Sequence, residues 1–167
     1  GEKCGLPPKQ VEILRMAAPM HDVGKVAIPD AILHRPGVLN DADFEIMKTH
    51  ATIGQSMLGT SNRPIMQAAA NISRQHHEKY DGTGYPDGLT GEEIDIFARI
   101  TAIADVFDAL ASDRVYRKAC PMPKVLEYFK EQSGKHFDPT LLDLFLENIT
   151  AFQKIRTKFS EDAVTTP

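Results

Sequence analysis

The spacing of apolar residues is the feature that most restricts what this chain can fold into. Apolar side chains recur at intervals of three and four residues in most segments, and runs that alternate apolar with polar residues are scarce. The first pattern is typical of helices that bury one face, the second of strands. The sequence therefore predicts an all-α protein, a helical bundle of about six to seven helices. Its 167 residues are enough for one domain with its own core.

Turn and capping residues set the expected limits of these helices. Pro19 is expected to kink or interrupt the last turn of the first helix. Asn40 is expected to cap the second helix, and Asp138 with Pro139 to begin the last one. Residues 161–167 are expected to form a flexible tail. The expected helices cover about residues 8–23, 41–58, 64–77, 96–112, 121–132 and 140–149.

Charge and cysteine usage limit the partners that the chain can have. The net charge is −4, whereas proteins that bind nucleic-acid polymers or membrane surfaces usually carry a basic excess. Cys4 and Cys120 lie far apart, which favours neither a disulfide framework nor a cysteine zinc site. No apolar run approaches the roughly 20 residues of a membrane helix. We expect a cytoplasmic domain that contacts neither a nucleic-acid polymer nor a membrane, and that can bind a small phosphate ligand.

Three of the expected helices place an imidazole on their apolar face. His21 extends the stripe of the first helix, and His76 continues that of the third. His50 lies at the centre of the expected apolar face of the second helix, which consists of Ile46, Met47, Ile53, Gly54 and Met57. Each histidine alone is more often a core residue satisfied by a neighbour. Together they favour a shared divalent cation, because burying several imidazoles leaves ring nitrogens in need of partners.

The helix expected over 96–112 is apolar around most of its circumference, yet it carries one narrow polar stripe. Carboxylates on a mostly buried helix are expected to be paired or to coordinate a metal. The stripe consists of Thr101, Asp105, Asp108 and Ser112. The alternative to a metal is an ion pair with an arginine, for which the candidates are Arg99, Arg114 and Arg117.

His21 and Asp22 are adjacent, and adjacent side chains of a helix diverge by roughly 100°. An imidazole and a carboxylate on different sides of a site suit two metals better than one. In a two-metal centre a bridging carboxylate holds both ions, and a shared water is deprotonated to a hydroxide nucleophile. A set rich in histidine and free of cysteine favours iron, manganese or zinc over magnesium or calcium. We expect iron or manganese.

Lys25 follows Asp22 by three residues, so its ammonium projects from the same face if helical geometry continues. A cation beside metals would hold a phosphate oxygen and offset the charge that develops there. The alternative is a solvated lysine at a helix end, where Gly24 already weakens the helix.

Two motifs resemble the HD-GYP family, a branch of the HD phosphohydrolases. Residues 21–25, His-Asp-Val-Gly-Lys, match the HD signature. Residues 76–86, His-His-Glu-Lys-Tyr-Asp-Gly-Thr-Gly-Tyr-Pro, match the family's HHExxDGxGYP signature in full. Residues 105–110 and 113–117 resemble a later block of the family in order and spacing. An HD dipeptide alone carries no weight, whereas the longer string is highly specific.

The resemblance implies an HD-type helical bundle that hydrolyses cyclic di-GMP to linear pGpG, and in some members onward to GMP, with two or three divalent ions. It implies that the metal ligands are His21, Asp22, His50, His76, His77 and Asp105. It implies catalytic roles for Asp22 and Lys25, with the lysine near the scissile phosphate. The positions that match substrate-contacting residues are Lys25, Gly84, Tyr85, Pro86, Asp108, Arg114 and Arg117.

Residues 82–86 are expected to form a bend, because glycine permits backbone conformations that other residues avoid. Such a bend would let the backbone approach a ligand. Tyr85 would offer a ring face to a base or to a partner protein, such as the GGDEF domain of a diguanylate cyclase. The alternative is a rigid structural turn. We favour a loop that lines the site, because it directly follows His76 and His77.

Family members usually have a further helix upstream that adds histidine or glutamate ligands. Only twenty residues precede His21 here, with no histidine among them. We expect residues 1–160 to be an HD-GYP domain without that helix, and the natural protein to have an upstream receiver or sensory domain. The alternatives to a phosphodiesterase are an inactive domain that binds cyclic di-GMP or a partner protein, and a hydrolase of other nucleotides or phosphate esters.

Overall fold

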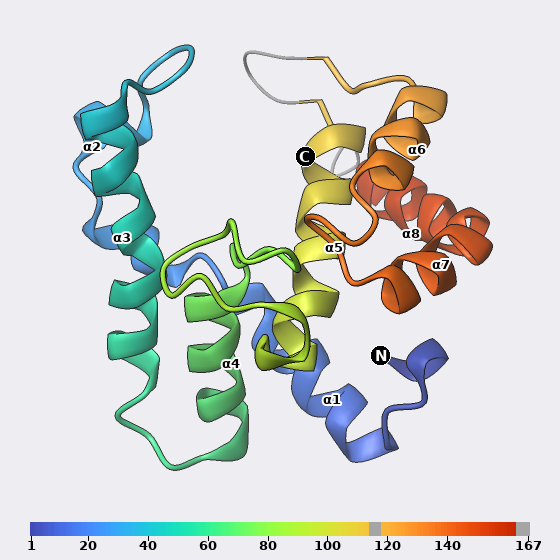
Figure 1. The fold of residues 1–167 in the computed structure, drawn as a ribbon, viewed down its shortest axis with the longest axis horizontal. Coiled ribbons are helices and arrows are strands. Elements are labelled where there is room, and N and C mark those ends of the chain that lie inside the picture. Colours follow the sequence, from blue (N-terminus) through green and yellow to red (C-terminus); the bar gives the residue numbers. More distant parts are fainter. Residues whose placement is uncertain (114–117, 163–167) are drawn as a thin grey trace.

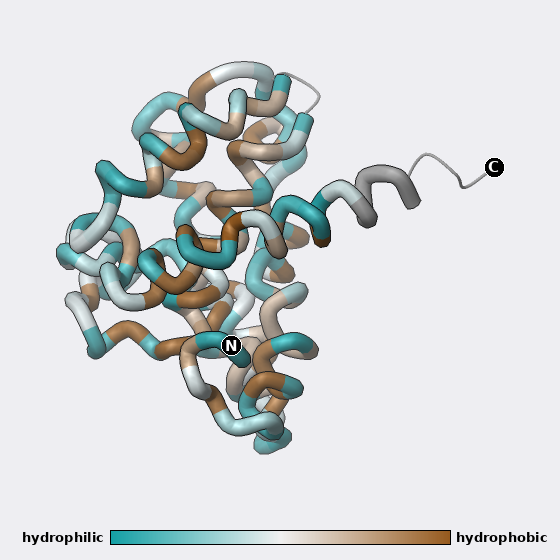
Figure 2. Tube along the Cα trace, turned by 90° about the vertical axis from the view of Figure 1, so that its right-hand side faces the viewer, coloured by the Kyte–Doolittle hydropathy of each residue, from teal (hydrophilic) through white to brown (hydrophobic). Residues whose placement is uncertain are grey.

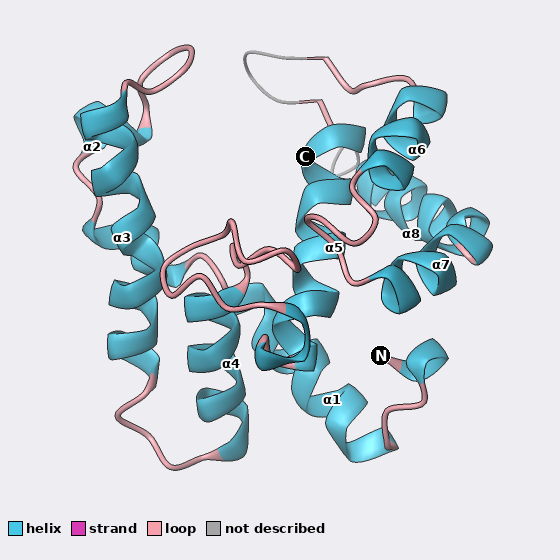
Figure 3. Cartoon of the chain, viewed as in Figure 1, coloured by secondary structure: helices cyan, strands magenta, loops and turns pink. Residues whose placement is uncertain are grey.

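The computed structural model describes residues 1–113 and 118–162, and this part of the chain consists of helices joined by loops (Figure 1). The α-helices are α1 (Pro8–Ala17), α2 (Asp30–Leu33), α3 (Asp41–Leu58), α4 (Pro64–Gln75), α5 (Ile96–Ala111), α6 (Met122–Glu131), α7 (Pro139–Glu147) and α8 (Ile149–Asp162). The 3-10 helices are η1 (Glu2–Cys4), η2 (Ala18–Met20), η3 (Val23–Ala27) and η4 (Gly91–Glu93). Figure 3 shows no strand among the described residues, so the predicted all-α class is confirmed.

Two apolar clusters form the core. The first joins α1, α3 and α4 and is made of Leu14, Ala17, Leu58, Ala69, Ala70 and Ile72. The second joins α5, α6 and α7 and is made of Ile103, Phe107, Ala111, Val125, Phe129, Phe137, Leu141, Leu142 and Phe145. Ile100 of α5 packs against both clusters. In Figure 1, α3 and α4 lie on one side of α5, and α6 to α8 lie on the other. Helix α5 therefore connects the two halves of the molecule.

The expected helices are found with shifted ends, and two further helices appear. The predicted caps are confirmed, since the Asn40 side chain accepts from the Asp43 amide and Asp138 begins α7. Helix α2 is a single turn in a segment expected to contain only turns. Helix α8 was not predicted, and in Figure 2 it leads away from the rest of the chain. It also covers the first two residues of the predicted tail, and residues 163–167 lie outside the described part. None of the described helices is long and apolar enough to cross a membrane.

The first helix is shorter than predicted. It was expected to reach residue 23, but α1 ends at Ala17 and is followed by η2. Pro19 explains the difference, because proline has no N–H to donate and its ring collides with the preceding turn of an α-helix. His21 and Asp22 therefore lie in a tight turn between η2 and η3 rather than on an α-helix.

The buried face of α3 also differs from the prediction. His50 is buried as expected, but Ile46 and Met57 are exposed. The face that packs inward carries small residues beside His50, namely Ala51 and Gly54, and ends at Leu58. The prediction is right for His50 and Gly54 and wrong for Ile46 and Met57, because this side of α3 makes a close backbone contact rather than a contact between large side chains.

Candidate metal centre

Gly24 brings the turn with His21 and Asp22 against α3. A Cβ atom at Gly24 would overlap the His50 carbonyl oxygen and lie 2.6 Å from the Gly54 nitrogen, so only glycine fits this crossing. Gly24 was expected to weaken a helix here, and the same lack of a side chain allows η3 to pack closely on α3. The crossing places Asp22 beside His50, although 28 residues separate them in sequence.

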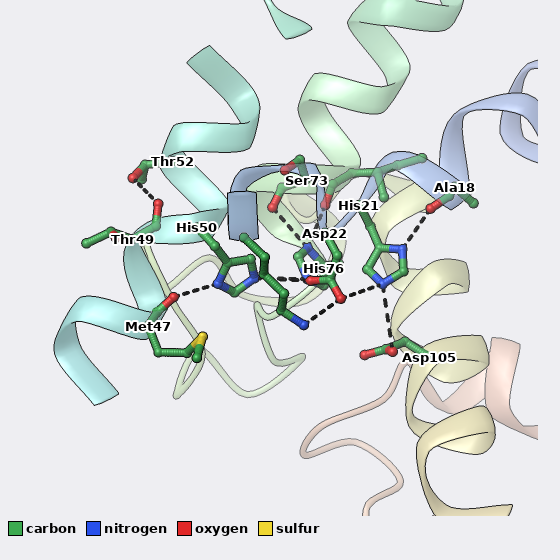
Figure 4. A network of polar contacts seen from close by, with 12 residues as sticks. Ala18, His21, Asp22, Met47, Thr49, His50, Thr52, Ser73, His76 and Asp105 are labelled. Atoms are coloured by element: carbon green, nitrogen blue, oxygen red, sulfur yellow. Dashed lines mark hydrogen bonds and ion pairs between the residues drawn. The ribbon is translucent and has the colours of Figure 1, made fainter. Parts of the chain in front are cut away.

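The Asp22 carboxylate lies between imidazoles on both sides (Figure 4). Its Oδ1 is 3.5 Å from His50 Nε2 and 3.6 Å from His76 Nε2. Its Oδ2 is 3.3 Å from His21 Nε2 and 2.6 Å from Lys25 Nζ. The predicted divergence of His21 and Asp22 is wrong, because the pair lies in a turn and the two side chains converge. The Asp22 carboxylate alone contacts both sides of the site, with Oδ1 toward His50 and His76 and Oδ2 toward His21 and Lys25.

Asp105 approaches from α5 on the His21 side, with its Oδ1 3.8 Å from His21 Nε2. Arg99, one of the alternative partners, instead donates to Asp138 at 2.6 Å. The structure thus brings Asp105 to the centre. In Figure 4, His21, His50 and His76 surround the Asp22 carboxylate, and Asp105 is joined to this group through His21.

Three imidazoles are oriented by their own backbone. The Nδ1 atoms contact carbonyl oxygens three residues earlier: His21 with Ala18 at 2.8 Å, His50 with Met47 at 2.6 Å and His76 with Ser73 at 2.9 Å. Because a carbonyl only accepts, Nδ1 carries the proton and the lone pair of Nε2 is left facing Asp22. This is the arrangement in which an outer hydrogen bond fixes the tautomer and orientation of a metal-binding imidazole.

The inner part of the site fits a divalent cation. Asp22, His50, His76 and His77 each offer a ligand atom, and these four atoms lie within 4.8 Å of one another. His50 Nε2 and His76 Nε2 are 3.5 Å apart, although both are acceptors in this tautomer. Asp22 Oδ1 is buried without a hydrogen-bond partner among the described residues. A cation between these atoms satisfies all of them, and the donor set of imidazoles with one carboxylate suits a transition metal.

Burial and charge give the members of the site different protonation behaviour. Burial, assisted by His76 and His50, lowers the pKa of His77 to about 2, and burial also lowers the pKa of His50. Burial raises the pKa of the Asp22 carboxyl, but its close contacts with His21, His76 and the Lys25 ammonium outweigh burial and hold that pKa well below its usual range. His50 and His77 are therefore neutral and Asp22 is ionised, which are the forms that bind metal.

The loop after α4 is fixed by a buried carboxylate. Glu78 accepts from the backbone amides of Asp87 at 2.7 Å and Leu89 at 3.1 Å. Arg74 of α4 pairs with Asp87 through both carboxylate oxygens, each at 2.6 Å. At Gly84 a Cβ atom would lie 2.6 Å from the Glu78 carbonyl carbon, so this glycine permits a close approach. The loop therefore folds back tightly over the residues that follow His77.

Tyr85 lies over the metal-ligating segment. Its ring stacks on His77 with 4.8 Å between centroids and an interplanar angle of 26°. Burial raises the pKa of its hydroxyl, and the charges of Asp22 and Asp105 raise it further. One ring face of Tyr85 is thus occupied by His77, and the predicted position of this loop at the site agrees with the structure.

The remaining predicted site residues are placed as follows. Lys25 lies at the centre through its ion pair with Asp22, and its side chain is not merely solvated. Asp108 accepts from Ser112 at 3.0 Å and lines a groove with Phe152 and Arg156 of α8. No contact among the described residues joins Asp108 to the imidazoles, and its substrate role stays a prediction. The predictions for Arg114 and Arg117 lie outside the described residues.

Glu78 and the carbonyl groups that orient the imidazoles were missed by the sequence reasoning. Glu78 stands inside the loop signature, but its burial follows from a chain reversal that hydrophobic periodicity does not reveal. The carbonyl contacts follow a regular spacing, because each carbonyl belongs to the residue three positions before a predicted ligand. The sequence alone does not show which histidines make such a contact.

With this geometry in view, comparison with known proteins defines the family. The family model described as "HD domain" matches residues 1–141, and the chain belongs to that family. A solved structure titled as a cyclic GMP-AMP specific phosphodiesterase of Vibrio cholerae superposes with a TM-score of 0.70 at 19% identity, covering 100% of this chain and 46% of that one. That similarity confirms the HD-type helical fold.

Curated relatives refine the family assignment. The chain is 46% identical over 159 residues to the cyclic di-GMP phosphodiesterase response regulator RpfG of Xanthomonas campestris, covering 95% of this chain and 42% of that protein. It is 45% identical to the 3'3'-cGAMP-specific phosphodiesterase 2 of Vibrio cholerae, covering 94% and 30%. It is 44% identical to a cyclic di-GMP phosphodiesterase of Thermotoga maritima, covering 87% and 40%. The chain thus spans less than half of each relative, and the predicted resemblance to the HD-GYP branch is confirmed.

Proposed function

We propose that this chain hydrolyses a phosphodiester bond of cyclic di-GMP to give linear pGpG, with two divalent metal ions, iron or manganese; whether GMP follows is a second outcome of the assay. The observation that carries the proposal is the Asp22 carboxylate with His50 and His76 at one oxygen and His21 with Lys25 at the other. Relatives at 46% and 44% identity are named cyclic di-GMP phosphodiesterases, which supports this substrate.

The residues divide into two groups of metal ligands. His50, His76 and His77 would hold one ion with Oδ1 of Asp22, and His21 with Asp105 would hold the other with Oδ2. Divalent ions held there supply Lewis-acid chemistry and a nucleophile at neutral pH. A third ion would need ligands from an upstream helix.

The chain's own side chains provide binding and positioning. Lys25 is fixed 2.6 Å from Asp22 Oδ2, so its ammonium stands at the edge of the centre, where it binds a phosphate oxygen and offsets negative charge. Tyr85 and the backbone around Gly84 and Pro86 cover the centre and limit the access of water. Asp108, Arg114 and Arg117 would also contact the substrate.

The test is incubation of the metal-reconstituted protein with cyclic di-GMP under anaerobic conditions, with chromatographic detection of pGpG and GMP. 3'3'-cGAMP belongs in the assay because one relative is named for it. We expect cyclic di-GMP to be consumed and Asp22→Asn to be inactive. An intact substrate, with the full-length protein carrying measured metal, would contradict the proposal and favour a domain that only binds. That alternative is not favoured, because all six predicted ligand positions are filled.

Longer relatives suggest how the domain is controlled. One relative is named a response regulator, and the present chain covers 42% of it. We propose that an upstream receiver or sensory domain controls residues 1–160 in the cytoplasm, and that a GGDEF domain docks on the Tyr85 loop. Pull-down of a diguanylate cyclase by the full-length protein, with Tyr85→Ala as the variant, tests the docking, and unchanged capture by the variant would contradict it.

A further inference from the structure

Phe44 and Lys48, on one turn of α3, contact Tyr85, and Glu45 of the same turn pairs with Lys48. Phe44 is 45% exposed, although a phenylalanine of a folded domain is usually buried. The side chain of Glu45 is 69% exposed and that of Lys48 is 26% exposed. Phe44 and Lys48 are four residues apart and share a helix face. Packing of the core does not account for this group, because neither apolar cluster includes Phe44.

The group is continuous with the metal centre. The rings of Phe44 and Tyr85 meet edge to face, with centroids 6.2 Å apart at 83°. Lys48 Nζ lies 5.5 Å from the Phe44 centroid and 5.7 Å from that of Tyr85. Tyr85 in turn stacks on His77, one of the proposed metal ligands. A substrate whose phosphate occupies the centre would therefore place a neighbouring base near this turn of α3.

The charged pair beside Phe44 offers a donor and an acceptor side by side. Lys48 Nζ is 2.6 Å from Glu45 Oε1. An ion pair between neighbouring side chains on a helix surface contributes little to stability. The Lys48–Glu45 pair complements the edge of guanine, which carries an acceptor, O6, next to a donor, N1–H. Adenine carries the reverse, an amino donor next to an unprotonated N1.

We propose, building on the phosphodiesterase function proposed above, that Phe44, Glu45 and Lys48 bind one guanine base of the substrate. Phe44 stacks on the base, Lys48 donates to O6 and Glu45 accepts from N1–H. Stacking tolerates any base, whereas the charged pair selects guanine, because adenine would set donor against donor and acceptor against acceptor. The three residues thus determine which cyclic dinucleotides are good substrates.

The experiment compares kcat and KM of the full chain on cyclic di-GMP, 3'3'-cGAMP and cyclic di-AMP. Lys48→Met and Glu45→Met are expected to raise KM for cyclic di-GMP by roughly 10- to 100-fold, with little change in kcat, and to reduce the preference for it over cyclic di-AMP. Phe44→Ala is expected to raise KM for all three substrates. Lys124→Met, an exposed lysine of α6, is the control and is expected to match the wild type. Circular dichroism checks that each variant keeps the helix content of the wild type.

The outcomes separate this proposal from the one that it rests on. If the wild type is active but Lys48→Met and Glu45→Met keep its KM and its preference, the guanine site is overturned and the phosphodiesterase function stands. If the wild type cleaves none of the three substrates, the proposed function fails. The base site is then tested by calorimetric binding of cyclic di-GMP and cyclic di-AMP to the same variants. Equal affinities of the wild type for both would overturn it.

Discussion

Toward Oδ1 of Asp22 lie the imidazoles of His50 and His76, whose side chains are 1% and 0% exposed. Toward Oδ2 lie side chains that solvent reaches, His21 at 21% and Asp105 at 29% exposed. On the inner side, backbone carbonyls orient both imidazoles. The outer side adds a second carboxylate and the ammonium of Lys25. One carboxylate thus joins a buried ligand set to a solvent-exposed one, where a substrate has room.

Replacement of the shared carboxylate should have the largest effect, because both sides depend on it. Changes to groups that only support a metal ligand cost roughly 10- to 100-fold in affinity or activity. Asp22→Asn, which keeps the shape and removes the charge, is therefore expected to lower phosphodiesterase activity by more than about 100-fold and to lower the metal content. Activity assays and elemental analysis on the same sample check this, with Asp30→Asn on α2 as the control. Full metal content in the variant would mean that Asp22 does not join the two sides.

Variants on opposite sides should separate the two metal positions. His50→Ala removes an inner ligand and leaves a buried cavity, so we expect loss of the more tightly held ion together with lower stability. Asp105→Ala removes an outer ligand, so we expect loss of the more weakly held ion with little change in stability. Elemental analysis and thermal unfolding measure both. Identical metal loss in the two variants would show that the sides do not differ.

A smaller effect is expected from the loop that covers both sides. In Glu78→Gln the new amide must present an N–H to one of the backbone amides that the carboxylate now satisfies, which costs about 1–3 kcal/mol. The midpoint of thermal unfolding should fall by several degrees, and KM for the dinucleotide should rise as the Tyr85 loop loosens. Glu131→Gln, an exposed residue of α6, is the control. Hydrogen exchange of the Asp87 and Leu89 amides reports the loop directly, and unchanged protection would contradict the role given to Glu78.

The smallest effect on activity concerns a histidine outside the centre, whose protonation changes stability instead. Burial lowers the pKa of His136 to about 4, and its ring stacks on Phe137 with centroids 4.3 Å apart. The unfolded chain takes up this proton near pH 6.5, so the stability from neutral His136 is complete above that pH and is lost as the pH falls toward 4, by about 1.4 kcal/mol per pKa unit.

The His136→Gln variant should therefore lose less stability between pH 6.5 and pH 4 than the wild type does. Urea unfolding at several pH values, with metal present, measures the difference, and the exposed His34→Gln variant is the control. The comparison of His136→Gln with the wild type isolates the acid sensitivity of a buried imidazole that binds no metal. The acid sensitivity of the inner ligands, which release metal on protonation, is the same in both proteins. An identical pH dependence of the wild type and His136→Gln would contradict the assignment.

Much of the site could be predicted because helical periodicity and the loop signature pointed to the same residues. His50 and Asp105 lie where the helix faces placed them. His21 reaches the centre by another route, since Pro19 ends α1 and a turn replaces the expected helix. The close crossing at Gly24 was not predictable, because periodicity describes one element and not its partner. The burial of Glu78 was not predictable for the same reason, because it depends on the loop folding back so that the Asp87 and Leu89 amides reach Glu78.

Crystals soaked in manganese or grown with iron give the most direct test of a carboxylate shared between two sides. The account predicts two anomalous difference peaks that both contact Asp22, one beside His50, His76 and His77, and the other beside His21 and Asp105. A single peak, or two peaks of which one does not contact Asp22, would contradict it.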